Sequence, residues 1–353
     1  MPAELTPAQD LLADLAADLD EIGAILVPCG AAALVEELAM LHPGAKLHWL
    51  PIDARELPLR EGNIVVHDDI ADPGLDERSI DLVVIEATGD RDLVRRWLAL
   101  ARNVARANGI VLIAGANDAG IKSAIGDARE AIGLSVVEDF RRRNRVAHIA
   151  APPVPPPAPD WLEEPGIAPG SWARFAVAEG GVDLVFETLP GVFSADRLDE
   201  GTRLLLEHLD VPPGSSVLDV GCGAGVIGVV AGRRGAGSIT MTDVNLLAVA
   251  AARRNAALAA GLVEVVAGDV YGAVSERRFD LIVSNPPFHQ GKVVDYDMPH
   301  RLIAGAGEHL TPGGRLVLVA NAFLPYDRLM REHLGEVETI AVTRQYRVLA
   351  STV

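Results

Sequence analysis

The chain has 353 residues and a net charge of −18, with 49% hydrophobic and 23% charged residues. This mixture is typical of globular proteins, and the length suits about two domains. The negative charge argues against avid, non-specific binding of a phosphate backbone, because such binding requires a basic surface. A nucleic-acid substrate would have to bind through a local patch of the protein surface.

The sequence contains no uncharged apolar run of the ~18 residues that a membrane span needs. Its two cysteines, Cys29 and Cys222, stand far apart and form no pattern of metal ligands. Free cysteines in a chain of this kind are typical of a reducing compartment. We therefore expect a cytoplasmic protein without a membrane segment and without a metal.

Apolar runs alternate with helical patterns through the first 150 residues. Leucines spaced along residues 5–21 predict an amphipathic helix. Strand-like runs follow at 24–28, 47–50, 63–66, 81–85, 109–114, 134–137 and 145–150, and helical patterns lie at 30–41, 91–106 and 121–132. This alternation predicts a parallel sheet with helices on its faces.

A proline-rich stretch interrupts this pattern. Residues 151–159 contain six prolines, which predicts a semi-rigid, extended linker. We place a first domain over residues 1–150, the linker over 151–165 and a second domain over 166–353.

The second half of the chain repeats the first. Residues 25–30 match 217–222, residues 81–86 match 280–285, and residues 109–117 match 314–321. We therefore predict an α/β protein with two doubly wound, Rossmann-like domains in tandem. The first copy lacks the glycine cluster and the Asn-Pro-Pro-Phe motif of the second, so we expect it to be degenerate.

A glycine-rich loop follows the short apolar strand at 217–220. The loop contains Gly221, Cys222, Gly223 and Gly225, and an apolar helix begins directly after it. Glycines let the backbone approach a ligand closely, and a helix N-terminus presents unpaired N–H groups. The stretch fits the dinucleotide fingerprint G-x-G-x-x-G, and it also fits the Asp-x-Gly-x-Gly-x-Gly loop of S-adenosylmethionine enzymes.

Three carboxylates favour S-adenosylmethionine over a dinucleotide. Asp219 precedes the loop and can accept from the ammonium group of an amino acid, whereas a dinucleotide offers no such group. Asp243 ends the next strand-like run and can hold two ribose hydroxyls. Asp269 ends the third run, at 263–270, and can accept from an adenine amino group.

The Asn-Pro-Pro-Phe motif ends a fourth strand-like run, at 281–283. Two consecutive prolines cannot donate ladder hydrogen bonds, so the strand must stop there. The side-chain oxygen of Asn285 and the carbonyl of Pro286 can then accept the hydrogens of an amino group, and Phe288 can stack on its ring. These residues predict a site for a planar arylamine, with the three as candidate catalytic residues.

Residues 189–349 resemble the ribosomal RNA guanine-N2 methyltransferases, most closely those of the small-subunit (16S) RNA. The matching stretches are 189–194, 218–226, 284–289 and 319–326. The resemblance implies tandem class I methyltransferase domains, S-adenosylmethionine as the cofactor, and N2 of a 16S guanine as the methyl acceptor. It also implies a ribosomal subunit as partner and suggests that Phe193 and Ser194 close over the cofactor. We expect a monomer.

Several alternatives remain at this point. The closest is methylation of a guanine N2 in 23S RNA; DNA adenine and protein glutamine methyltransferases use related motifs. A non-catalytic ribosome assembly factor and a nicotinamide dehydrogenase belong to other classes. His289 is either an RNA contact or a loop residue. A basic cluster, Arg141, Arg142, Arg143 and Arg145, either contacts phosphates or keeps a sheet edge soluble.

Overall fold

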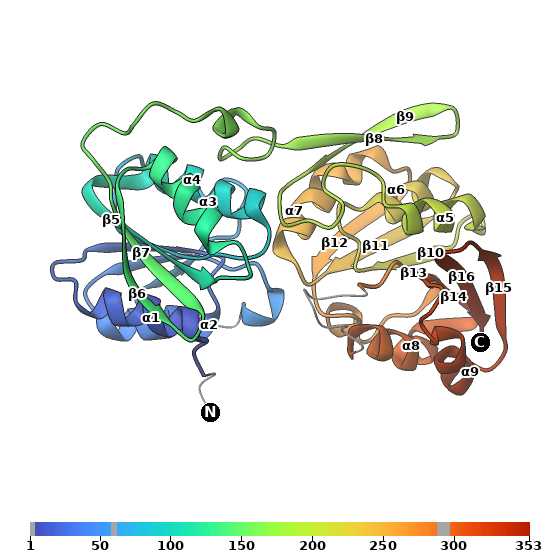
Figure 1. Ribbon diagram of the computed structural model, residues 1–353. Helices are drawn as coiled ribbons and strands as arrows, with labels where there is room; N and C mark the ends of the chain where they lie inside the picture. Colours follow the sequence, from blue (N-terminus) through green and yellow to red (C-terminus); the bar gives the residue numbers. More distant parts are fainter. Residues whose placement is uncertain (1–3, 58–61, 288–296) are drawn as a thin grey trace. The chain divides into compact units, whose positions relative to one another are not determined.

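The computed structural model describes residues 4–57, 62–287 and 297–353, and the chain forms two compact units (Figure 1). The first unit comprises Met1–Ala173 and Leu189–Gly191. The second comprises Arg174–Thr188 and Val192–Val353. No helix in the described ranges has the length and apolar character that would let it cross a bilayer.

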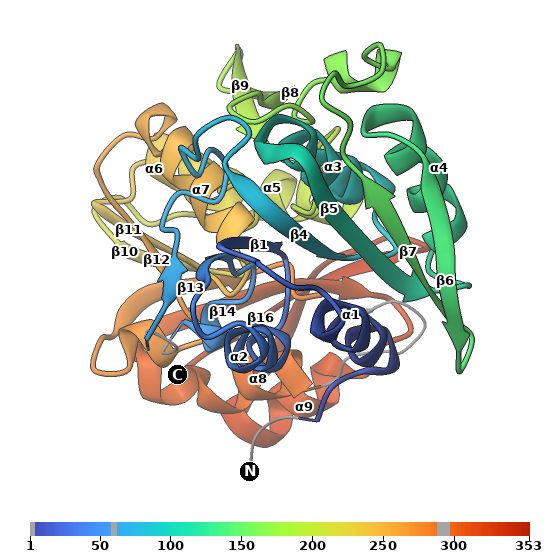
Figure 2. The ribbon, with the colours of Figure 1, turned by 90° about the vertical axis from the view of Figure 1, so that its left-hand side faces the viewer.

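The first unit is a seven-stranded sheet between two layers of helices. Its elements are α1 (Pro7–Ala17), β1 (Ala24–Pro28), α2 (Ala32–Leu41), β2 (Lys46–Leu50), η1 (Ala54–Glu56), β3 (Ile64–Val66), β4 (Ile80–Glu86), α3 (Arg91–Val104), β5 (Ala105–Ala116), α4 (Ile121–Ala131), β6 (Ser135–Arg141), β7 (Asn144–Ala150) and η2 (Asp160–Glu163). The strand order is β3-β2-β1-β4-β5-β7-β6. Helices α1 and α2 cover one face, and α3 and α4 cover the other (Figure 2).

The second unit repeats this arrangement. A two-stranded sheet, β8 (Ala173–Glu179) and β9 (Val182–Thr188), comes first. There follow α5 (Glu200–His208), β10 (Ser216–Val220), α6 (Val226–Arg233), β11 (Ser238–Asp243), α7 (Leu246–Asn255), η3 (Ala256–Leu258), β12 (Leu262–Ala267), η4 (Gly272–Val274), β13 (Phe279–Ser284), α8 (Asp297–His309), β14 (Leu310–Asn321), α9 (Tyr326–Leu334), β15 (Val337–Val342) and β16 (Tyr346–Thr352). The order β12-β11-β10-β13-β14-β16-β15 matches that of the first unit position for position, which confirms two copies of one doubly wound fold.

The prediction of a parallel sheet is wrong for one strand of the first unit, β7. Six strands run in the same direction, but β7 lies between β5 and β6 and pairs antiparallel with both. Strands β6 and β7 are joined through Arg142 and Arg143, both of which have positive φ. So short a connection can form a hairpin but cannot cross over to a parallel strand.

The central strands place several polar residues at one edge of the second sheet. Strands β10, β11, β12 and β13 are parallel neighbours, so their carboxyl ends meet at the same edge. One predicted boundary is wrong: the third of these strands ends at Ala267, and Asp269 lies two residues beyond it. In parallel α/β sheets, ligands bind at this edge.

The proline-rich stretch and the turn after it pack against the first unit. Trp161 is 5% exposed, and its Nε1 donates to Oε2 of Glu130 at 3.3 Å. The guanidinium carbon of Arg95 lies 5.1 Å from the centroid of the Trp161 ring. Arg102 donates to the carbonyl of Pro156 at 2.8 Å. All of these contacts lie within the first unit. The limits given above for the first domain, the linker and the second domain remain a prediction.

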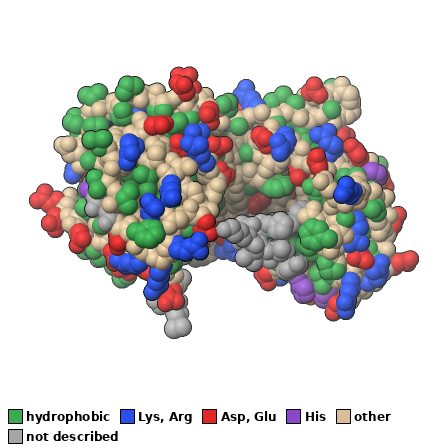
Figure 3. Space-filling model, viewed as in Figure 1, with side chains coloured by type: hydrophobic (Ala, Val, Ile, Leu, Met, Phe, Trp, Pro, Cys, Tyr) green, Lys and Arg blue, Asp and Glu red, His purple; other side chains and the backbone are tan. Residues whose placement is uncertain are grey.

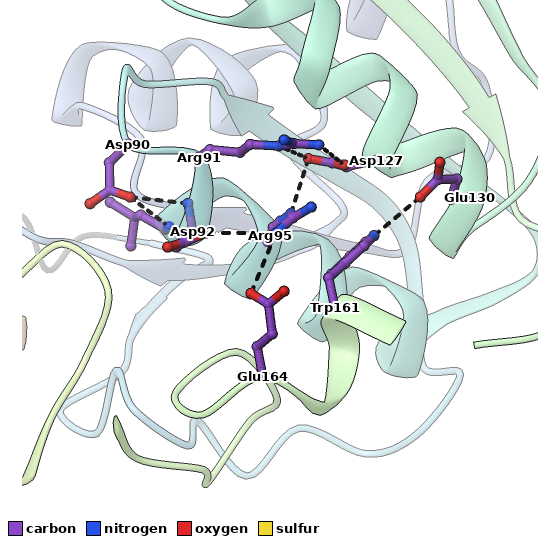
Figure 4. A network of polar contacts seen from close by, with 9 residues as sticks. Asp90, Arg91, Asp92, Arg95, Asp127, Glu130, Trp161 and Glu164 are labelled. Atoms are coloured by element: carbon purple, nitrogen blue, oxygen red, sulfur yellow. Dashed lines mark hydrogen bonds and ion pairs between the residues drawn. The ribbon is translucent and has the colours of Figure 1, made fainter. Parts of the chain in front are cut away.

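A buried carboxylate holds α3 against α4 in the same region (Figure 4). Asp127, on α4, is 2% exposed and accepts from Nε and Nη2 of Arg91 at 2.8 and 2.7 Å. It also accepts from Nε of Arg95 at 3.3 Å. The side chain of Arg95 is 13% exposed and reaches Glu164 at 3.4 Å, so the network extends from α4 through α3 to the segment after η2.

We predict that Asp127→Ala lowers the free energy of unfolding by about 1–3 kcal/mol, because it leaves the largely buried Arg95 without its buried acceptor. Asp92→Ala is the matched control. Asp92 faces the same arginine at 3.8 Å but its side chain is 60% exposed, so its loss should cost less than about 0.5 kcal/mol. Urea unfolding of the full chain measures both, and equal costs would contradict the prediction.

Candidate active site

The glycine loop bends back on itself between β10 and α6. Gly221, Gly223 and Gly225 have φ of +70°, +55° and +84°, a region that other residues rarely adopt. At Gly225 a Cβ would also lie 2.9 Å from Sδ of Met241, so a side chain there is excluded by space as well. At Gly223 a Cβ would meet nothing within 4 Å, and the backbone is therefore open to an approaching ligand.

Asp243, at the end of β11, braces this loop. Its Oδ2 accepts from the N–H of Gly223 at 2.9 Å, and its Oδ1 accepts from the N–H of Asn245 at 2.9 Å. Burial raises the pKa of its carboxyl, although these backbone donors oppose the shift. Asp243 therefore fixes the loop from the neighbouring strand.

Asp219 lies beneath the loop with no exposed surface. Its Oδ2 accepts from the N–H of Gly228 at 2.9 Å, whereas no described residue donates to its Oδ1. Burial and, to a smaller extent, the charge of Asp243 raise the pKa of Asp219 to about 7. A buried carboxylate with one unsatisfied oxygen can receive a proton or a cationic group.

A hollow opens above the loop within the second unit. It is lined by Phe175, Phe193, Ser194, Arg197, Leu198, Asp199, Thr202, Gly221, Cys222, Gly223, Ala224, Val226, Ile227 and Asn285. Six of the predicted residues thus lie around one hollow: Phe193, Ser194, Gly221, Cys222, Gly223 and Asn285. Phe193 is 64% exposed at the rim, where a large apolar side chain is available to cover a ligand.

Other predicted residues are not among those lining the hollow. Asp243 accepts from the loop and Asp219 accepts from the start of α6, as described above, and Gly225 ends the loop as the N-cap of α6. Both carboxylate oxygens of Asp269 accept from Arg301 of α8, at 2.7 and 3.0 Å. Pro286 follows β13 but does not line the hollow, and Phe288 and His289 lie outside the described residues.

Asn285 is held by two residues that the sequence did not single out. Its Nδ2 donates to Oδ2 of Asp199 at 3.0 Å and to Oγ1 of Thr202 at 2.8 Å. Its Oδ1 is buried and receives no hydrogen bond from any residue that the structure describes. Asp199 is the N-cap of α5, a role that an Asp before a helical pattern could have revealed. The contact of Asp199 with Asn285, 86 residues away along the chain, could not have been predicted from the sequence.

The first unit lacks the carboxylates that surround the loop. Val27 stands in β1 where Asp219 stands in β10, as the matching strand registers show. The same registers set Pro51 at the position of Asp243. Neither a valine nor a proline side chain can accept a hydrogen bond, so these two positions of the first unit cannot bind a ligand as Asp219 and Asp243 could.

Comparisons with known proteins agree with this geometry. The Methyltransferase small domain family matches residues 183–350. Ribosomal RNA small subunit methyltransferase C of Chromohalobacter salexigens is 40% identical over 262 residues, 71% of this chain and 72% of the relative. The protein of the same name from Pseudomonas paraeruginosa is 48% identical over 174 residues, 49% of this chain and 51% of the relative.

A solved structure extends the similarity to nearly the whole chain. It is the T. thermophilus 16S rRNA N2 G1207 methyltransferase (RsmC) in complex with AdoMet and guanosine. The TM-score is 0.82 at 28% identity, with 98% of this chain and 92% of that chain covered. The family resemblance and the tandem class I methyltransferase fold predicted from the sequence are confirmed.

We predict that Asp219→Asn stabilises the ligand-free protein, and increasingly so as the pH rises. The folded state raises the pKa of Asp219 from 3.8 to about 7. Its neutral form is thus favoured, and ionisation costs folding free energy between about pH 4 and pH 7. Because Asn carries no charge, the variant should be more stable by ~2–4 kcal/mol at pH 8 and by less at pH 5.

Urea unfolding at the two pH values, compared with the wild-type protein, measures this difference. Asp183→Asn, at an exposed position of β9, is the control and should show no such trend. A stability difference for Asp219→Asn that stays constant between pH 5 and pH 8 would contradict the assignment.

Proposed function

Because the chain belongs to the ribosomal RNA small subunit methyltransferase C family, we propose that it transfers a methyl group from S-adenosylmethionine to the exocyclic N2 of a guanine in 16S ribosomal RNA. The observation that carries this proposal is the amide of Asn285. Both of its hydrogens are bound within the protein, and its buried oxygen beside the glycine loop has no described donor. Such an oxygen is suited to accept from an amino group.

The residues around the loop fit S-adenosylmethionine. The backbone from Gly221 to Gly225 and the start of α6 would hold its amino-acid part. Oδ1 of Asp219, to which no residue in the described ranges donates, would accept from its ammonium group. Asp243 would hold the ribose, and Phe193 and Ser194 would cover the cofactor. We also assign Asp269 to the adenine, although in the ligand-free chain its oxygens are bound to Arg301. When bound, S-adenosylmethionine supplies an electrophilic methyl group on a positively charged sulfur.

The chain's own part in the reaction is to hold and polarise the guanine amino group. The lone pair of that nitrogen is delocalised into the ring, which makes it a poor nucleophile. Asn285 Oδ1 and the Pro286 carbonyl would accept its two hydrogens and so return electron density to the nitrogen. One of these hydrogens would leave as a proton to water once the nitrogen carries the methyl group. Phe288 would stack on the base. Orientation of this kind can contribute several kcal/mol without a strong base.

We propose that the substrate is ribosomal RNA within a small subunit. The protein would bind it as a monomer, in the cytoplasm and without a metal. The net charge of −18 disfavours tight binding of naked RNA. On the face shown in Figure 3, Lys and Arg side chains are interspersed with Asp and Glu, and no broad basic surface stands out. Contacts with other parts of a ribosomal subunit would supply the affinity that charge does not.

Substitution of Asn285 tests the site. We predict that Asn285→Ala lowers turnover by at least about 10²-fold, because the acceptor for the amino hydrogens is lost. The dissociation constant for S-adenosylmethionine, measured by calorimetry, should change less than about threefold, because the loop stays intact. Wild-type turnover in this variant would refute the proposed role.

The target can be tested in cells that lack the gene. Mass-spectrometric mapping of both ribosomal RNAs should show the loss of one N2-methylguanine from 16S RNA and none from 23S RNA. The wild-type gene should restore it and the Asn285→Ala gene should not. A loss confined to 23S RNA would assign the alternative target. Unchanged methylation with defective subunit assembly would indicate a non-catalytic assembly factor.

A further inference from the structure

The amide of Asn285 is attached to α5 through both of its hydrogens. One hydrogen is accepted by Oδ2 of Asp199, the N-cap of the helix. The other is accepted by Oγ1 of Thr202, the third residue of the helix. The same Oδ2 accepts from the backbone N–H of Thr202 at 2.8 Å, so the helix cap and the amide share one oxygen. All three side chains line the hollow above the glycine loop.

We propose that Asp199 and Thr202 are positioning residues, which fix the orientation of the Asn285 amide so that its oxygen is presented to the amino group of the substrate. This inference rests on the proposed function. A carboxamide is nearly symmetric in shape, and only its hydrogen-bond partners decide which end is oxygen. An amide rotated by 180° would present N–H groups to the substrate's own N–H groups and could not bind them.

The two residues contribute differently because their chemistry differs. An ionised carboxylate accepts hydrogen bonds and cannot donate them, so Asp199 admits only the amide nitrogen as its neighbour. The hydroxyl of Thr202 can donate as well as accept, so it would tolerate either end of the amide. Asp199 therefore decides the orientation, while Thr202 mainly fixes the position.

The first unit provides an internal comparison. Glu86 occupies the strand-end position that corresponds to Asn285, and Thr6 is the N-cap of α1. The carboxylate of Glu86 accepts from Oγ1 of Thr6 at 3.3 Å and from Nε2 of Gln9 at 2.8 Å. The helix and the strand end are thus joined in both units, but the donors and acceptors are exchanged. Joining the two elements therefore does not require an Asn whose oxygen receives no hydrogen bond from the described residues, as in the second unit.

Two substitutions at Asp199 separate positioning from helix capping. Ser and Asn both serve well as N-caps, so Asp199→Ser and Asp199→Asn should preserve α5 equally. Only Asn is long enough to keep an oxygen in the place of Oδ2 and accept from Asn285. We expect kcat on small ribosomal subunits to fall on the order of 10²-fold for Asp199→Ser and less than about tenfold for Asp199→Asn.

Further variants complete the experiment. Thr202→Val keeps the shape and the backbone N–H, and should lower kcat less than Asp199→Ser does. Asp53→Ser, which makes the same change at the N-cap of η1 in the first unit, should leave kcat unchanged. Thermal unfolding and the calorimetric dissociation constant for S-adenosylmethionine should stay close to wild type in all of them.

The decisive measurement combines Asp199→Ser with Asn285→Ala. If Asp199 acts through Asn285, the double variant should be no slower than Asn285→Ala alone. Additive losses, equal kcat for the Ser and Asn variants, or a weakened cofactor affinity would each overturn the inference. If Asn285→Ala itself kept wild-type turnover, the proposed function would fail. An inactive Asn285→Ala beside a fully active Asp199→Ser would refute the positioning role alone.

Discussion

The parallel pairing of β10 with β11 on one side and β13 on the other is the constraint on which the site depends. The register sets Asp219 of β10 opposite Met241 and Val283, so the three strands end at the same level. The residues that end or follow these strands then lie at one edge: the glycine loop after β10, Asp243 at the end of β11 and Asn285 after β13. Residues spread over more than 60 positions of sequence are brought together by ladder hydrogen bonds, without any contact among their side chains being needed first.

Much of this arrangement could be predicted because its signals are local. Buried parallel strands appear as short apolar runs, two prolines mark the end of β13, and positive φ at three loop positions explains their glycines. The sequence could not reveal where the side chains of Asp199 and Asp269 would point. Their partners, Asn285 and Arg301, are 86 and 32 positions away, and no local pattern encodes such a pairing.

The two units have the same fold, and only a few residues distinguish the unit with the candidate site from the unit without it. Their strand orders are equivalent, and in each a helix N-cap is hydrogen-bonded to the end of one central strand, β4 in the first unit and β13 in the second. The first unit lacks the glycine cluster, and it differs at matched strand positions: Val27 for Asp219, Pro51 for Asp243 and Glu86 for Asn285. A fold is set by packing and register, whereas the site is set by a few polar side chains at its edge.

The burial of those polar side chains lowers the stability of the folded protein, and this loss of stability indicates that they serve a function other than folding. Burial raises the pKa of Asp219 towards neutrality and leaves its Oδ1 without a described donor, and Asn285 Oδ1 is buried in the same state. Buried acceptors without partners destabilise a folded protein. Valine at the Asp219 position of the first unit avoids this penalty. The second unit retains both acceptors, and under the proposed function a cationic amino acid and an arylamine would supply the donors.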